Sequence, residues 1–268
     1  MRRGGVEADF SRAALGRARP AVLECAPLST FDLGQPGQKF FTSAWRTGFR
    51  ALFRATARVQ IARLAPVPMS GPLILACNHI SHFDPPLAGS FFPRHVDWMA
   101  MEELFRDKRF ARLLEITGAF PVHRDGTDRT ALRTAVRRLQ AGRVVGIFPE
   151  GGIRAGETSI LEGAAMRPGV GALSVLANAP VLPCVVAGTD RLYHKTNWLR
   201  RPPLWVLTGE LIVPPAGDDR EAARREVHDR LTAAFPALKT ELVARFRLEE
   251  CDLPHTPQAR KGEDPYAP

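Results

Sequence analysis

Lysine is scarce in this sequence, and cysteine pairs and long apolar runs are missing. Only five of the 37 basic residues are lysines, so arginine carries nearly all of the positive charge. The four cysteines form no Cys-x-x-Cys pair, which argues against a zinc knuckle or a disulfide framework and indicates a reducing cytosol. No apolar run reaches the roughly 18 residues that a membrane-spanning helix needs. No apolar stretch follows the basic first residues, so we expect no signal peptide.

The composition is that of a globular protein with a basic surface. The chain has 268 residues, of which 45% are hydrophobic and 24% charged, and this predicts one domain with appended segments. The net charge of +9 favours anionic partners such as phosphate head groups, a membrane surface or nucleic acid. Charge alone does not choose among these partners. The excess of arginine over lysine also arises in a genome whose base composition favours arginine codons.

The order of predicted elements is that of an α/β fold. Apolar runs predict buried strands at residues 73–77, 96–100, 144–148, 181–186 and 204–213. Helical periodicity predicts helices at 127–140 and at 218–246, the second broken near Pro236. We expect a mixed, mainly parallel central sheet flanked by helices and preceded by an amphipathic N-terminal helix. The predicted segments are a loosely ordered arm (1–38), the amphipathic helix (39–65), the main domain (66–248) and a disordered tail (249–268).

The predicted N-terminal helix carries two stripes. The aromatic and apolar stripe consists of Phe40, Phe41, Trp45, Phe49, Leu52 and Phe53. The basic stripe consists of Arg46, Arg50, Arg54 and Arg58. An aromatic stripe beside unpaired arginines is typical of a helix in a membrane interface. We therefore expect a peripheral or monotopic protein on the cytoplasmic side of the cell membrane, in contact with anionic lipid. The alternative is a helix packed on its own domain with a solvated basic face.

A polar cluster follows the first predicted strand, where open α/β sheets place their chemistry. It reads Asn78-His79-Ile80-Ser81-His82-Phe83-Asp84. A tight turn lets Asp84 accept a hydrogen bond from one nitrogen of His79, which leaves the other nitrogen basic. The alternative is a turn in which Asp84 caps a helix and His79 is incidental.

Three further blocks lie at predicted strand ends or loop edges. The first runs from Gly118 to Arg124, with Pro121 inside it. The second, Phe148-Pro149-Glu150-Gly151-Gly152-Ile153-Arg154, follows a strand, and the third is the apolar stretch 181–186 with Pro183. In this order and spacing the four blocks resemble the glycerolipid acyltransferase family, typified by 1-acylglycerol-3-phosphate acyltransferase. That family's blocks read N-H-x4-D, G-x-x-P-x-x-R, F-P-E-G and a V-x-P-like strand, and the resemblance covers about residues 66–215.

The resemblance implies an O-acyltransferase that needs no cofactor beyond its thioester co-substrate. His79 is then the base and Asp84 its orienting group, and acyl-CoA or acyl-carrier protein is the donor. The acceptor is a lysophospholipid, first of all 1-acyl-sn-glycerol-3-phosphate, which yields phosphatidic acid. Arg124 suits the acceptor phosphate, because guanidinium binds phosphate in a bidentate way, and Glu150 suits a glycerol hydroxyl or Arg124. The expected substrate-binding residues are Asn78, Ser81, Gly118, Pro121, Arg124, Phe148, Pro149, Glu150, Gly151, Arg154 and Pro183.

One departure and two other classes remain open at this stage. Many family members continue the third block as E-G-T-R-S, whereas this chain has Gly152-Ile153-Arg154, which allows another lysolipid or a glycolipid as acceptor. A metallohydrolase using His79, His82 and Asp84 is a weaker alternative, since no other His/Asp cluster completes a metal site. Nucleic-acid binding explains the charge but not polar turns at strand ends, so we expect no nucleic-acid partner.

Overall fold

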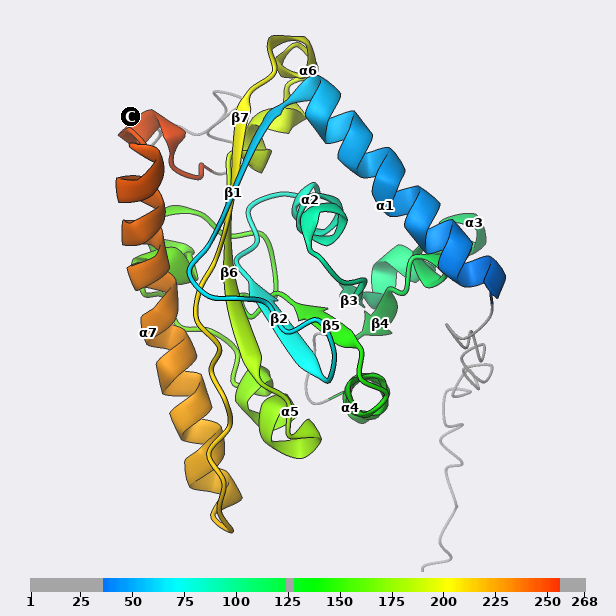
Figure 1. The fold of residues 1–268 in the computed structure, drawn as a ribbon, viewed down its shortest axis with the longest axis vertical. Helices are drawn as coiled ribbons and strands as arrows, with labels where there is room; N and C mark the ends of the chain where they lie inside the picture. Colours follow the sequence, from blue (N-terminus) through cyan, green and yellow to red (C-terminus); the bar gives the residue numbers. More distant parts are fainter. Residues whose placement is uncertain (1–35, 124–127, 256–268) are drawn as a thin grey trace, which may run out of the picture. The chain divides into compact units, whose positions relative to one another are not determined.

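Seven strands form one mixed sheet in the part of the chain that the computed structural model describes, residues 36–123 and 128–255 (Figure 1). Their order across the sheet is β1-β7-β6-β2-β5-β3-β4. Their bounds are Arg58–Arg63 (β1), Leu73–Cys77 (β2), Val96–Met101 (β3), Phe120–Val122 (β4), Val144–Ile147 (β5), Val181–Ala187 (β6) and Pro203–Thr208 (β7). Neighbours run parallel except β6 and β7, which are antiparallel. The predicted α/β class with a mainly parallel sheet is confirmed.

Helices cover both faces of this sheet. Their bounds are Pro36–Thr56 (α1), Asp84–Phe91 (α2), Lys108–Ile116 (α3), Arg129–Gln140 (α4), Gly169–Ala177 (α5), Asn197–Arg200 (α6) and Arg220–Phe246 (α7). On β2, Ile74 and Ala76 pack into the core shared with α4, α5 and α7, whereas Leu73 and Leu75 pack into the core shared with α1 and α2. Successive strand residues point to opposite faces, and both faces of β2 are buried, so its sequence is apolar throughout.

The helix predicted for residues 39–65 is too long at its C-terminal end. Helix α1 ends at Thr56, and residues 58–63 form the edge strand β1, parallel to β7. Val59 and Ile61 are half-buried and alternate with exposed Arg58 and Gln60, a period of two that suits an edge strand. The helix also begins at Pro36, inside the segment predicted as an arm; residues 1–35 of that arm lie outside the described residues.

The predicted break in the C-terminal helix is wrong, and the predicted disordered tail differs from the structure at its first residues. Helix α7 runs unbroken through Pro236, because Phe235, Leu238 and Leu242 are buried around the proline and packing offsets its lost hydrogen bond. The start of the predicted disordered tail is held in place, since Arg191 Nη2 lies 2.7 Å from Asp252 Oδ1. Residues 256–268 of that tail lie outside the described residues.

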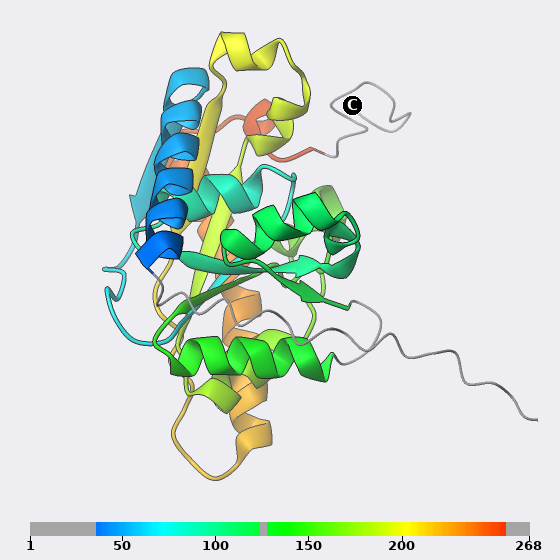
Figure 2. The same ribbon diagram turned by 90° about the vertical axis from the view of Figure 1, so that its right-hand side faces the viewer.

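Helix α1 packs along α2 through its basic stripe (Figures 1 and 2). Arg50 donates to the carbonyl oxygen of Ser90 at 2.6 and 3.0 Å, and Arg46 donates to that of Phe92. These carbonyls lie at the C-terminal end of α2, where a cation is favoured by the helix dipole. The prediction of an unpaired arginine stripe on lipid is therefore wrong for Arg46 and Arg50.

The opposite face of α1 is exposed and almost free of charge. Its exposed residues are Phe40, Phe41, Ser43, Ala44, Thr47, Gly48, Ala51, Leu52, Arg54 and Ala55. Phe53 is fully buried and Phe49 is partly buried against the core. None of the described helices is long and apolar enough to cross a membrane.

Candidate active site

The centre of the site is a histidine held by a buried carboxylate. His79 lies two residues beyond the end of β2, and its Nδ1 lies 2.9 Å from Oδ2 of Asp84. The side chain of His79 is 12% exposed and that of Asp84 is not exposed at all. A buried carboxylate that accepts from Nδ1–H fixes the ring orientation and leaves Nε2 basic and available to a substrate. The predicted His79–Asp84 contact is confirmed.

Asp84 is itself held by several donors. Its Oδ2 accepts the backbone N–H groups of Ile80 at 2.7 Å and Ser81 at 2.8 Å. Its Oδ1 accepts the hydroxyl of Thr189, which lies just beyond β6. Such charge-assisted bonds keep a buried carboxylate in place. Asp84 also opens α2, whose first turn contains prolines, so the positive end of the helix dipole favours the carboxylate as well.

Asn78 and Ser81, predicted to contact substrate, have structural tasks instead. Both are fully buried. The amide of Asn78 donates to the carbonyl of Val186 at 3.0 Å and accepts its N–H at 2.7 Å, which joins the end of β2 to β6. The Ser81 hydroxyl accepts the N–H of Phe83 at 3.1 Å and thereby closes the turn that carries the histidine. Buried polar groups need partners, and the protein supplies them here.

Glu150 also differs from its predicted role. Its Oε2 accepts the backbone N–H of His79 at 2.5 Å, and its Oε1 accepts the Ser159 hydroxyl at 2.8 Å and the Ile160 N–H at 3.0 Å. Both oxygens are thus engaged by the protein, and Glu150 supports the backbone of His79 and does not line the cavity described below. Burial raises the pKa of Glu150 to about 7, although the three donors act in the opposite direction.

Aromatic rings support His79 from the other side. The His79 ring stacks on Phe148 with centroids 4.1 Å apart, and Phe148 stacks on Trp98 at 4.8 Å. Gly146 makes room for Trp98, because an added Cβ there would lie 2.4 Å from the indole ring. The row of rings restricts the tilt of the imidazole and forms one wall of a cavity.

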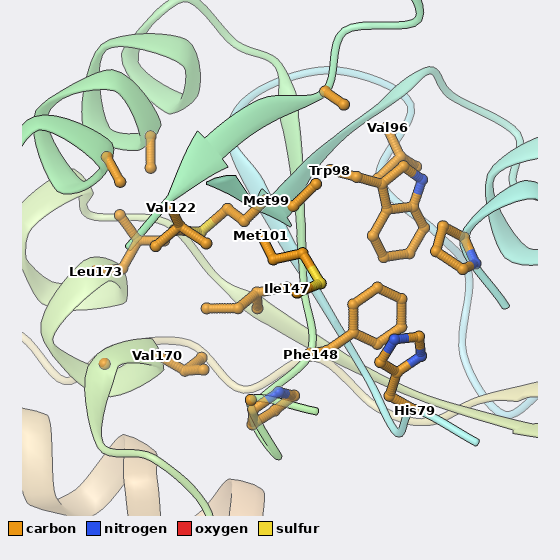
Figure 3. A pocket seen from close by; sticks show the side chains of 18 of the residues that line it. His79, Val96, Trp98, Met99, Met101, Val122, Ile147, Phe148, Val170 and Leu173 are labelled. Carbon is orange, nitrogen blue, oxygen red and sulfur yellow. The ribbon is translucent and has the colours of Figure 1, made fainter. Parts of the chain in front are cut away.

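That cavity has a volume of about 1210 Å³ and is lined mainly by apolar side chains. Figure 3 shows His79, Phe148 and Trp98 at one end and Val170 and Leu173 at the other. The cavity is larger than the roughly 300–1,000 Å³ of a common small-molecule pocket. Of the predicted substrate-binding residues, Phe148, Pro149 and Gly151 line it.

Among the residues that the structure describes, the other predicted substrate-binding residues do not line this cavity. Pro183 is buried in β6, Pro121 lies in β4 and Arg154 is exposed. Gly118 has φ +85° and approaches Asp97 so closely that an added Cβ would lie 2.5 Å from its carboxylate, so only glycine suits this turn. Arg124 lies outside the described residues.

His82 is hydrogen-bonded to Tyr193 and not to the Asp84 carboxylate in the described part of the chain. Its Nδ1 lies 2.6 Å from the hydroxyl of Tyr193, which also accepts the His82 N–H at 3.1 Å. Burial, and then the nearby His79, lower the pKa of His82. Because His79, His82 and Asp84 do not converge on one point, the alternative of a metal site built from them is not supported by this geometry. Within residues 36–123 and 128–255, no group of three or more His, Cys, Asp or Glu side chains is placed to hold a metal ion.

Sequence reasoning missed two supports of the site. Thr189 and Tyr193 follow β6 in a short 3-10 helix, beyond the last recognised block. Their position after a buried strand, at the same sheet edge as His79, is a signal that could have pointed to the site. It is a weak signal, because an isolated threonine or tyrosine at a strand end is common in any α/β protein.

Comparisons with known proteins show similarity to acyltransferases. Residues 58–187 match a family model described as Acyltransferase. A Bacillus subtilis protein named 1-acyl-sn-glycerol-3-phosphate acyltransferase is 28% identical over 131 residues, which are 48% of this chain and 63% of that protein. The crystal structure of the 1-acyl-sn-glycerophosphate (LPA) acyltransferase PlsC from Thermotoga maritima has the same fold, with a TM-score of 0.55 and 23% identity over 75% of this chain and 82% of that one. The chain thus spans less than two thirds of the curated relative.

Proposed function

We propose that this chain is an O-acyltransferase that acylates a lysolipid, because its residues 58–187 match the Acyltransferase family model. The donor is a thioester, either acyl-CoA or acyl-carrier protein, and the first acceptor is 1-acyl-sn-glycerol-3-phosphate, which gives phosphatidic acid. The observation that carries the proposal is the His79–Asp84 pair at the wall of a large apolar cavity. A positioned base beside a space for an acyl chain is what this transfer requires.

The chemistry follows from the position of His79. Its Nε2 takes the proton of the acceptor hydroxyl while that oxygen forms a bond to the thioester carbonyl carbon. The carbon–sulfur bond then breaks, and the imidazolium returns its proton to the thiolate. Asp84 stabilises the imidazolium in between. A base of this kind contributes about 10²–10⁴-fold to the rate.

The two substrates occupy different surroundings in this proposal. The apolar part of the cavity, with Met99, Ile147 and Leu173 on its walls, suits a fatty acyl chain, since burying each CH₂ group is worth about 0.8 kcal/mol. By family resemblance, Arg124 holds the acceptor phosphate.

A second acceptor remains a candidate because of Arg154. Its backbone N–H donates to the carbonyl of His79 at 2.8 Å, while its side chain is exposed and lies off the cavity. The side chain of Arg154, which follows Gly152 and Ile153, thus faces solvent and not the cavity. The acceptor can therefore carry a head group other than the phosphate of 1-acyl-sn-glycerol-3-phosphate, as a glycolipid or another lysolipid does.

We place the enzyme at a membrane surface, on the cytoplasmic side. A lipid acceptor has to be reached from a bilayer, and the outward face of α1 carries Phe40, Phe41 and Leu52 with Arg54 as its only charged residue among those described. The inward face of the same helix lines the cavity through Trp45 and Phe49. A helix of this kind can rest in the interface while the cavity opens beneath it.

The test is an acyl-transfer assay with radiolabelled or chromogenic thioester release over a panel of acceptors. We expect turnover with lysophosphatidic acid, complete loss in His79→Ala and Asp84→Ala, and a smaller loss in His82→Ala, with all variants folded by circular dichroism. An inactive His82→Ala beside an active His79→Ala would refute the base assignment. Turnover with a glycolipid or another lysolipid alone would replace the proposed acceptor.

A further inference from the structure

A group of basic side chains borders the cavity where α5 and α7 meet it. It consists of Arg167, which precedes α5, and of Arg224, Arg225 and His228 on the first turns of α7. We call these residues the α5–α7 basic cluster. They line the same cavity as His79, although α7 lies outside the family match and the sequence analysis assigned no task to its basic residues.

The chain brings these residues together through two close approaches. At Gly171 an added Cβ would lie 2.4 Å from the carbonyl oxygen of Arg224, so α7 packs directly on the backbone of α5. At Gly151, with φ +67°, an added Cβ would lie 2.3 Å from Nε of Arg167. The backbone N–H of Arg167 also donates to the carbonyl of Pro149 at 3.0 Å. The Arg167 guanidinium therefore lies against the loop that carries Glu150.

Polar atoms of the cluster on α7 are buried without a counterpart. Arg224 Nε and His228 Nδ1 have no solvent contact and no hydrogen-bond partner among the described residues. The acidic residue that borders this end of the cavity is Glu221, and it is 3.9 Å from Arg224 with its own side chain 69% exposed. Buried polar atoms without partners, such as these two, are costly unless a ligand supplies the partner.

We propose that the α5–α7 basic cluster is a binding site for a phosphate group of a substrate held in the cavity. Guanidinium groups bind phosphate oxygens in a bidentate way through charge-assisted hydrogen bonds. The proposal rests on the proposed function, in which both the acceptor and the thioester donor carry phosphate. None of the four residues of the cluster belongs to the four sequence blocks that carry the family resemblance.

Binding tests the site without turnover. The probes are glycerol 3-phosphate and coenzyme A, titrated by calorimetry into the His79→Ala protein and into His79→Ala combined with Arg224→Gln or Arg167→Gln. We expect each arginine substitution to weaken binding of one probe about tenfold or more, since each removes charge-assisted hydrogen bonds. The matched control is Arg220→Gln, which removes the same charge from an exposed position on α7 that does not line the cavity.

Steady-state kinetics identify which substrate provides the phosphate. If it is the acceptor's, Arg224→Gln raises KM for lysophosphatidic acid and leaves KM for monoacylglycerol unchanged. If it is the donor's, the same variant raises KM for acyl-CoA and leaves KM for an acyl-N-acetylcysteamine thioester unchanged. Arg167→Gln lies on a different element, so it serves if Arg224→Gln fails to fold.

Equal affinity for both probes in the variants and the parent overturns the site, as does an equal loss in Arg220→Gln. Calorimetry remains decisive if no acyl transfer is found with any acceptor, so failure of the proposed function and failure of the site give different results.

Discussion

Replacing Glu150 by glutamine tests whether this carboxyl is a buried support of the histidine. Glu150 is 8% exposed, and its three donors include the backbone N–H of His79. Glutamine keeps the size of the glutamate side chain and one of its two acceptor oxygens. Its NH₂ group replaces the other oxygen and so lies opposite an N–H or O–H donor of the protein. Because glutamine does not titrate, the substitution also removes the pH dependence that Glu150 gives to stability.

The size and the sign of that pH dependence follow from burial. The pKa of Glu150 rises from an ordinary value of 4.5 to about 7 in the folded protein. Between these two values the folded chain binds more protons than the unfolded chain, so stability falls as pH rises and levels off above about pH 7. At 1.36 kcal/mol for each unit of pKa, the change is roughly 3 kcal/mol. The stability of the wild type relative to Glu150→Gln should therefore decline by roughly 3 kcal/mol from about pH 4.5 to 8.

The measurement is urea unfolding followed by circular dichroism at several pH values between 4.5 and 8. Glu157→Gln controls for loss of a carboxylate, because Glu157 is an exposed glutamate of the same loop. If the free energy of unfolding of the wild type minus that of Glu150→Gln stays constant or increases as pH rises, the reasoning is refuted. Such a result would mean that the three hydrogen-bond donors outweigh burial and keep Glu150 ionised in the folded protein.

Three other changes test the site and its surroundings. Thr189→Val removes the hydroxyl that donates to Asp84, so kcat should fall about tenfold with KM unchanged; an unchanged kcat would show that the backbone donors suffice. Arg124→Lys should raise KM for lysophosphatidic acid, because a point charge replaces a planar fork. An unchanged KM across acceptor concentrations would remove Arg124 from the phosphate site. Phe41→Ser combined with Leu52→Ser removes apolar side chains from the exposed face of α1 and should reduce sedimentation with both anionic and neutral vesicles. Equal sedimentation of this double variant and the wild type would place the docking surface elsewhere.

The central strands of the sheet can be predicted from the sequence, because their apolar character is visible without knowing which strands they pair with. β2, at Leu73–Cys77, was predicted residue for residue, and β5 and β6 differ from the prediction by one residue. Edge elements are harder to predict. The sequence pattern predicts helix over β1, because this half-buried strand of six residues has few apolar positions and follows a long helical pattern without a break. α4 was predicted to within two residues, since Asp128 caps it locally.

The membrane interpretation of α1 shows where amphipathic periodicity stops being informative. Periodicity separated one stripe of aromatics from one of arginines, but it cannot say which stripe meets protein. In the structure Arg46 and Arg50 satisfy the last carbonyls of α2, a demand that arises only once α2 lies beside α1. The exposed face of α1 combines small residues with Phe41 and Leu52 from the predicted aromatic and apolar stripe, whereas Phe49 and Phe53 of the same stripe pack against the core.

The sequence by itself determined the His79–Asp84 pair, because five positions of chain reach across one turn and no distant element is needed to join them. The tertiary structure alone decided what supports that pair. Glu150 is 71 positions from His79, and Thr189 is 105 positions from Asp84. The physical reason is that parallel strands bring their carboxyl ends to one sheet edge in an order that crossovers set. A carboxylate or a hydroxyl after a strand can bond a substrate or a neighbouring backbone equally well, and only the position of that neighbour decides between them.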